Sequence, residues 1–193
     1  MSKVIRSFLA FELPGEMNEI VKRVHAELTK SALDVKWMRP GNVHLTVVFL
    51  GNVSTQDLAP LGTEVSKVCS KYGRFEVELK GMGIFGGLRS PRVLWIGLRG
   101  DLERMGFFRD AISKRITRFG IKQEKRPFRP HLTLGRFRKG AKGGLHLKDI
   151  LDRYVGLTSP RQPLRELTLF RSDLRPEGAH YTKIESWPLE GNK

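Results

Sequence analysis

The chain has little of what marks several classes of protein. Only one of its 193 residues is a cysteine, Cys69, which excludes a disulfide framework and a cysteine-based metal cluster. No apolar run approaches the roughly 18 residues of a membrane-spanning helix. The first 14 residues lack the apolar stretch and the small cleavage-site residues of a signal peptide, and favour a strand. We therefore expect a cytoplasmic, monomeric protein with no membrane partner, folded as a single domain over residues 1–193.

Negative charge is also scarce. The 35 lysines and arginines outnumber the 20 acidic residues, so the formal net charge is +15. Much of the excess lies within residues 114–142, where Glu124 is the one acidic residue. Such an excess predicts a polyanionic partner, most simply nucleic acid, although a solvated basic face that aids solubility is the alternative. The basic residues of this stretch are Lys114, Arg115, Arg118, Lys122, Lys125, Arg126, Arg129, Arg136, Arg138, Lys139 and Lys142.

The spacing of apolar residues predicts interleaved strands and helices without a regular βαβ pattern, which is typical of an α+β fold. We expect the helix that follows residue 53 to open at Ser54 with a capping box. Residues 81–86 match G-x-G-x-x-G, but Pro91 follows too soon for the helix of a dinucleotide site, so a glycine turn is predicted. Strands are expected near 4–11, 35–38, 44–50, 75–79, 93–97, 131–137, 164–171 and 180–187, and helices near 15–31, 54–69, 101–119 and 147–155.

One short motif occurs twice. His44-Leu45-Thr46-Val47 and His131-Leu132-Thr133-Leu134 are nearly identical, and each lies in an apolar, strand-like run. Because side chains alternate along a strand, each histidine shares a face with its threonine while the apolar residues point to the other face. Each copy therefore presents one imidazole and one hydroxyl from a buried support.

The motif pair favours acid–base chemistry at a phosphate. No carboxylate or cysteine accompanies the histidines at metal-ligand spacing, so we expect no metal and no cofactor. A G-x-S-x-G nucleophile motif is also absent. Two imidazoles with an ordinary pKa near 6.5 can supply one base and one acid at neutral pH. Thr46 and Thr133 can donate hydrogen bonds to phosphate oxygens, and Arg136 can add a cationic contact. A polar face of a sheet is the structural alternative.

These residues resemble the 2H phosphoesterase superfamily, specifically its RNA 2′,3′-cyclic phosphodiesterases, also known as 2′–5′ RNA ligases. HLTVVFLG at 44–51 is similar to the first family signature, and PFRPHLTLGRF at 127–137 to the second. Val47 stands where leucine is familiar, which is a conservative departure. The segments RSFLAF at 6–11, RVLWIGL at 92–98 and SDLRPEGAHYTKI at 172–184 also resemble the family, so the likeness spans the chain.

The resemblance implies a bilobal α+β fold in which two pseudo-symmetric, mostly antiparallel sheets with flanking helices meet at a central cleft. It implies metal-independent hydrolysis of a terminal 2′,3′-cyclic phosphate, on RNA ends or nucleosides, to a 2′-phosphomonoester. His44 would donate a proton to the leaving 3′ oxygen and His131 would accept one from water, with Thr46, Thr133 and Arg136 binding the phosphate. Phe11 and Tyr181 are candidates for a base-binding wall, and packing in the core is the alternative for each of them. Ligation of RNA halves and a non-catalytic RNA-binding role are the alternatives.

Overall fold

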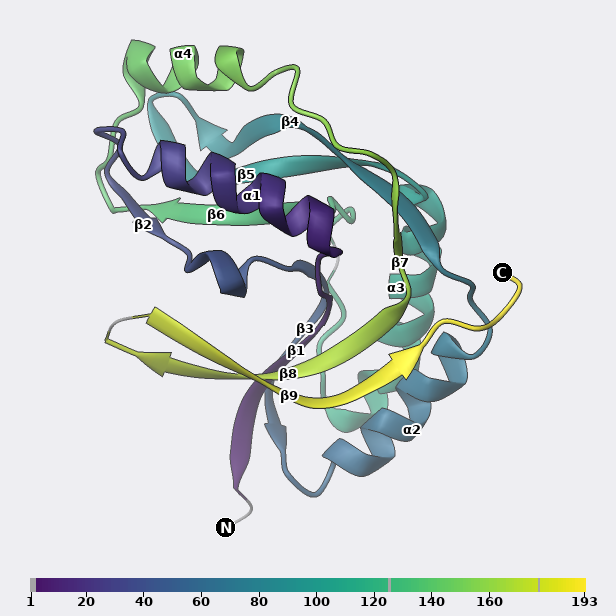
Figure 1. The fold of residues 1–193 in the computed structure, drawn as a ribbon. Coiled ribbons are helices and arrows are strands. Elements are labelled where there is room, and N and C mark those ends of the chain that lie inside the picture. Colours follow the sequence, from purple (N-terminus) through teal and green to yellow (C-terminus); the bar gives the residue numbers. More distant parts are fainter. Residues whose placement is uncertain (1–2, 125, 177) are drawn as a thin grey trace.

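The structure, a computed structural model, describes residues 3–124, 126–176 and 178–193 (Figure 1). The predicted elements are present, with shifted ends. The helices are α1 (Gly15–Leu28), α2 (Leu58–Cys69), α3 (Leu102–Ile116) and α4 (Gly144–Arg153), with 3₁₀ turns η1 (Pro40–Asn42) and η2 (Thr117–Phe119). The strands are β1 (Val4–Phe11), β2 (Val35–Trp37), β3 (Leu45–Ser54), β4 (Phe75–Gly87), β5 (Ser90–Gly100), β6 (His131–Phe137), β7 (Gln162–Leu164), β8 (Glu166–Arg175) and β9 (Gly178–Pro188).

The strands form one curled antiparallel sheet in the order β7-β4-β5-β6-β3-β1-β8-β9, with β2 added to β6 (Figure 1). Its two halves, β7-β4-β5-β6 and β3-β1-β8-β9, join through a single registered pair, Leu45 opposite Leu132. The bilobal α+β prediction is confirmed. The resemblance implied two sheets. In the structure, the Leu45–Leu132 pair joins the two halves into one continuous sheet.

The main apolar core runs behind both halves. It includes buried side chains from both central strands, such as Leu45 and Leu132, and from the helices, such as Met17 of α1, Val65 of α2 and Ile112 of α3. Burial of each such side chain is worth about 1.5–3 kcal/mol. The backbone that carries the two repeated motifs is therefore supported on one side by close-packed side chains. Among the described residues, no helix has both the length and the apolar character that a membrane crossing requires.

Two local predictions were wrong. Ser54 does not open a helix, because β3 continues through it and α2 begins at Leu58 without a side-chain cap. The glycine-rich segment 81–86 is not a turn but part of β4, which remains paired with β5 through Gly87. Gly81 and Gly86 have positive φ angles of 63° and 91°, and the ladder shifts register next to each of them. The glycines therefore accommodate bulges within a strand whose neighbour supplies the hydrogen bonds.

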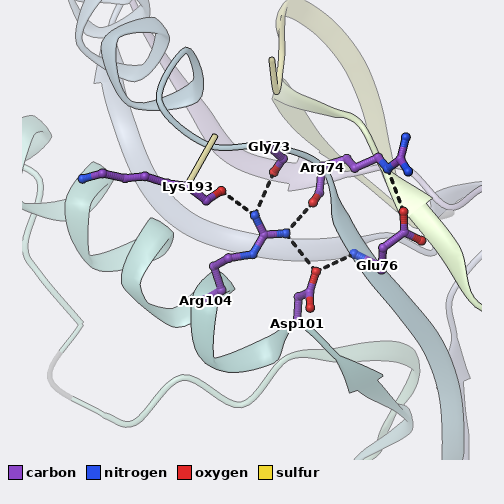
Figure 2. A network of polar contacts seen from close by, with 6 residues as sticks. All are labelled: Gly73, Arg74, Glu76, Asp101, Arg104 and Lys193. Carbon is purple, nitrogen blue, oxygen red and sulfur yellow. Dashed lines mark hydrogen bonds and ion pairs between the residues drawn. The ribbon is translucent and has the colours of Figure 1, made fainter. Parts of the chain in front are cut away.

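Arg104 of α3 joins three parts of the chain (Figure 2). Its guanidinium donates to the carbonyl oxygens of Gly73, Arg74 and Lys193, and to the Asp101 carboxylate. The same guanidinium lies 4.4 Å from the centre of the Phe75 ring, and Asp101 also accepts from the Glu76 N–H at 2.9 Å. This network fixes the start of α3 against the start of β4 and the last residues of the sequence.

Candidate active site

The junction of β3 and β6 brings the two His-Leu-Thr motifs together. Leu45 and Leu132, which lie inside the two motifs, form the antiparallel pair that joins the strands, so the histidine and threonine on either side of each leucine share the other face of this junction. Both leucines are at most 1% exposed, while all four polar side chains are half-buried on the other face. The two imidazoles and two hydroxyls therefore form one compact cluster.

Each imidazole is held by the same local contact. The Nδ1 atom of His44 lies 2.7 Å from the carbonyl oxygen of Asn42, and Nδ1 of His131 lies 2.7 Å from that of Arg129. A carbonyl oxygen can only accept, so Nδ1 carries the proton in both rings. In the neutral rings Nε2 is then the basic atom, and Nε2 of His44 lies 3.0 Å from the Thr46 hydroxyl oxygen. Both Nε2 atoms can thus exchange a proton with a bound group.

Aromatic side chains from five strands lie around the two imidazoles, with Phe170 of β8 the most distant from His44 at 6.3 Å. Phe8 of β1 stacks on His44 with ring centroids 4.6 Å apart, and Tyr181 of β9 meets His44 edge-on at 5.2 Å. Phe85 of β4 meets His131 edge-on at 4.8 Å, and Trp95 of β5 lies 6.4 Å away. These contacts restrict each imidazole to one orientation, which is a requirement for proton transfer in a fixed geometry.

This surrounding lowers both histidine pKa values below the ordinary 6.5. Burial is the main cause in each case, because it disfavours the charged imidazolium. The hydrogen bonds to the Asn42 and Arg129 carbonyls oppose the shift in part. Positive charge nearby adds to it, since His131 lowers the pKa of His44 and Arg136 lowers that of His131. The neutral, basic form of each ring is therefore favoured at neutral pH.

Arg136 is exposed near the histidines. No hydrogen bond or ion pair joins its guanidinium to another side chain in the described parts of the chain, although its charge acts on both His131 and Tyr181. Burial raises the pKa of Tyr181, and Arg136 opposes that rise. A guanidinium without a side-chain partner near His131 is available to an anion.

Phe11 does not line this site. Its side chain is fully buried in the main core, against Phe75 and Phe108, because it pairs across β1 and β3 with the core residue Leu45. Core packing, the alternative interpretation of Phe11, is what the structure shows, and Phe8 is the phenylalanine of β1 that stacks on His44. The sequence pattern of β1 could not show which of the two phenylalanines faces the histidines. Residues 8–11 are all apolar and buried, so both faces of this strand look like core.

Asn42 is a residue of the site that sequence reasoning missed. Its carbonyl accepts from His44, and its side-chain amide donates to the carbonyl oxygen of Ala179 at 2.7 Å. Ala179 lies at the start of β9, which also carries Tyr181. Asn42 therefore connects the backbone that orients His44 to the β8–β9 hairpin. The signal available in the sequence was only the Pro40-Gly41-Asn42 turn before the first motif.

The basic stretch 114–142 contributes less free charge than its composition indicates. Arg115 and Arg118 pair with the buried Glu64 at 2.9 and 3.2 Å. The hydrogen bond from Lys67, followed by these two arginines, lowers the pKa of that carboxyl to about 2. Two further arginines of the stretch, at 126 and 138, also form ion pairs. Lys125 lies outside the described residues. These four arginines therefore pair with acidic groups of the fold itself.

The central cleft stays a prediction. One cavity lies between α1 and α4, beside Glu27 and Tyr154, and a second, wider one lies beside α3 at Arg109 and Lys122. Neither is lined by the two histidines. The candidate site is thus defined by the polar face of the β3–β6 junction and the aromatic rings around it.

Proteins of known sequence or structure resemble this chain over nearly its whole length. It is 30% identical over 182 residues to the RNA 2′,3′-cyclic phosphodiesterase of Archaeoglobus fulgidus, covering 93% of this chain and 98% of that one. It is 27% identical over 190 residues to the enzyme of that name from Aquifex aeolicus, covering 98% and 100%. The structure of E. coli LigT in complex with 3′-AMP matches with a TM-score of 0.75 at 26% identity, covering 97% and 99%.

A protein from Thermus thermophilus has the same fold, with a TM-score of 0.82 at 23% identity and 98% and 100% coverage. The model of the LigT-like phosphoesterases matches residues 11–95 and 103–181, and each of these two segments contains one His-Leu-Thr motif. The family that the paired motifs indicated is thereby confirmed, and the chain belongs to the LigT-like phosphoesterases, which are 2H phosphoesterases.

Proposed function

We propose that this protein hydrolyses the terminal 2′,3′-cyclic phosphate of RNA to a 2′-phosphomonoester without a metal ion. The observation that carries the proposal is the pair of imidazoles, each with Nδ1 bound to a carbonyl and Nε2 available for proton transfer. A cyclic phosphodiester needs one proton removed from water and one delivered to the leaving oxygen, which is what such a pair supplies. The relatives named RNA 2′,3′-cyclic phosphodiesterase support the same substrate class.

In the proposed reaction, His131 and His44 act at opposite sides of the phosphorus. Nε2 of His131 accepts a proton from water as the water oxygen bonds to phosphorus. The bond between phosphorus and the 3′ oxygen breaks, and the His44 imidazolium delivers its Nε2 proton to that oxygen. The products are a 2′-phosphomonoester and a free 3′-hydroxyl, and exchange with solvent returns both imidazoles to their starting protonation states for the next turnover.

The neighbouring side chains are proposed to bind the phosphate. Thr46 and Thr133 lie on the same face as the imidazoles, so their hydroxyls can donate to the non-bridging oxygens. Arg136 offsets the charge of the phosphate, and the phosphate in turn favours the protonated form of the acid while substrate is bound. Tyr181, partly exposed beside His44, is the candidate contact for the terminal nucleoside.

Hydrolysis is tested with a nucleoside 2′,3′-cyclic phosphate in EDTA, followed by ³¹P NMR. We expect conversion to the 2′-phosphomonoester, and a loss of about 10²–10⁴-fold or more in kcat for His44→Ala and for His131→Ala. His146→Ala, on the exposed side of α4, is the matched control and should keep full activity. Absence of conversion by the wild-type protein, or persistence of activity in both histidine variants, would refute the proposal.

The same chemistry permits ligation if a 5′-hydroxyl of a second RNA replaces water. A gel assay on paired RNA halves distinguishes the two outcomes, because ligation produces a longer strand. A non-catalytic RNA-binding protein would instead bind RNA equally well with or without the two histidines, and would show no ³¹P change.

A further inference from the structure

An aromatic side chain is exposed in the middle of the sheet. Phe49 of β3 is 50% exposed, although Leu50 beside it and Val47 before it are buried. The guanidinium of Arg6, on β1, lies over its ring at 4.6 Å from the centroid. An exposed ring covered by a guanidinium presents two planar groups and one positive charge to solvent.

This pair lies on the face of the candidate active site. Residues directly opposite each other in an antiparallel pair point to the same face, and Phe49 lies opposite Phe8, which stacks on His44. Thr46 lies opposite Ala10 on the same face of β1. At about 3.3 Å per residue, Phe49 is roughly 10 Å along β3 from Thr46. Strand β3 thus carries both a phosphate-site threonine and the exposed ring.

Charge connects the pair to the same site. Arg6 and Arg136 both oppose the rise in the Tyr181 pKa, so both guanidinium groups lie within electrostatic range of this tyrosine. In the part of the chain that the structure describes, no carboxylate forms an ion pair with Arg6. Arg6, which covers the Phe49 ring, therefore adds its positive charge to that of Arg136 near Tyr181.

We propose that Arg6 and Phe49 bind the nucleotide that precedes the terminal one in an RNA strand. The inference rests on the proposed function, because it takes the terminal cyclic phosphate to lie at the two histidines. The next nucleotide is joined through the 5′ oxygen of the terminal one, and its base can stack on the Phe49 ring or on the outer face of the guanidinium. The guanidinium can contact the linking phosphate. The preferred substrate is then an RNA end of two or more nucleotides.

The kinetic test compares a dinucleotide ending in a 2′,3′-cyclic phosphate with the matching mononucleotide. Loss of one base–aromatic stack lowers affinity by about 5- to 150-fold. We expect Phe49→Ala to lower kcat/KM for the dinucleotide by such a factor and to leave the mononucleotide value unchanged. Phe49→Tyr should restore the dinucleotide value, whereas Phe49→Leu, which retains apolar bulk without a ring, should not. Phe107→Ala, which removes an exposed ring of α3, is the control.

Binding of an oligoribonucleotide that ends in a 2′-phosphate provides a second measurement that needs no turnover. In Arg6→Met, the slope of log K against log salt concentration should become shallower by about 0.7, the value for one phosphate contact on a single strand. Arg23→Met on α1 should leave the slope unchanged. Equal losses on mononucleotide and dinucleotide, or unchanged binding in Phe49→Ala, would overturn the inference. Failure of the proposed function is distinct, because the wild-type protein would then hydrolyse neither substrate.

Discussion

Replacement of Asn42 tests whether the β8–β9 hairpin positions His44. Asn42→Ala keeps the backbone carbonyl that accepts from Nδ1 of His44 and removes the side-chain amide that donates to Ala179. One hydrogen bond contributes about 0.5–1.5 kcal/mol, and each 1.36 kcal/mol changes a rate about tenfold. We therefore expect kcat to fall about two- to tenfold, well short of the effect of removing the imidazole itself.

The decisive measurement is the titration of each imidazole by NMR. Because Asn42 contacts His44 and the two imidazoles interact only through their charges, Asn42→Ala should shift the pKa and ring signals of His44 much more than those of His131. Asn42→Asp cannot donate to the Ala179 carbonyl and places a negative charge near His44, so it should raise the pKa of His44. Asn18→Ala, on α1, is the matched control and should change neither ring.

The reasoning is refuted if Asn42→Ala has the kcat of Asn18→Ala. It is also refuted if kcat falls while both imidazoles titrate as in the wild-type protein, because the loss would then not act through His44. A fall in Tm without a change in the His44 titration would show that Asn42 supports the fold and not the imidazole.

Three further properties can be measured. Burial lowers the pKa of both His44 and His131 below 6.5 in the free protein. A plot of kcat/KM against pH should therefore be bell-shaped with its maximum below pH 6.5. A maximum above pH 7 would contradict this expectation. Arg104→Met removes hydrogen bonds to three carbonyls and a carboxylate and should lower the Tm by roughly 4–12 °C. The control Arg74→Met loses one exposed ion pair and should change the free energy of unfolding by less than about 1 kcal/mol. Equal Tm values for the two variants would refute the assigned role of the network. Burial raises the pKa of the Cys69 thiol to about 12, so a thiol reagent should label it only after unfolding.

The two catalytic candidates were accessible to sequence reasoning because their signal is local. A period of two places His44 with Thr46, and His131 with Thr133, on one face of each strand, and the buried leucines between them are consistent with that period. The repeat itself indicated that the two strands act together. Neither observation requires knowledge of which strand pairs with which.

Other parts of the site depend on contacts between distant segments. Phe8 and Phe11 belong to one apolar strand, and only the packing of β1 between β3 and β8 places one on His44 and the other in the core. The glycines at 81–86 are typical of a turn in isolation, yet pairing with β5 keeps them extended. The sequence does not show that Arg115 and Arg118 are paired, because their partner, Glu64, lies on α2, about 50 residues earlier in the chain.

The two His-Leu-Thr pairs, and the face on which each one lies, follow from the sequence alone, since alternation along a strand is a property of the local backbone. The α+β class and the positive charge follow from the sequence as well. Only the tertiary structure decided that the pairs meet through Leu45 and Leu132, that Asn42 links His44 to a hairpin 137 residues later, and which cations remain unpaired. These features depend on antiparallel register and long-range packing, which no short segment encodes.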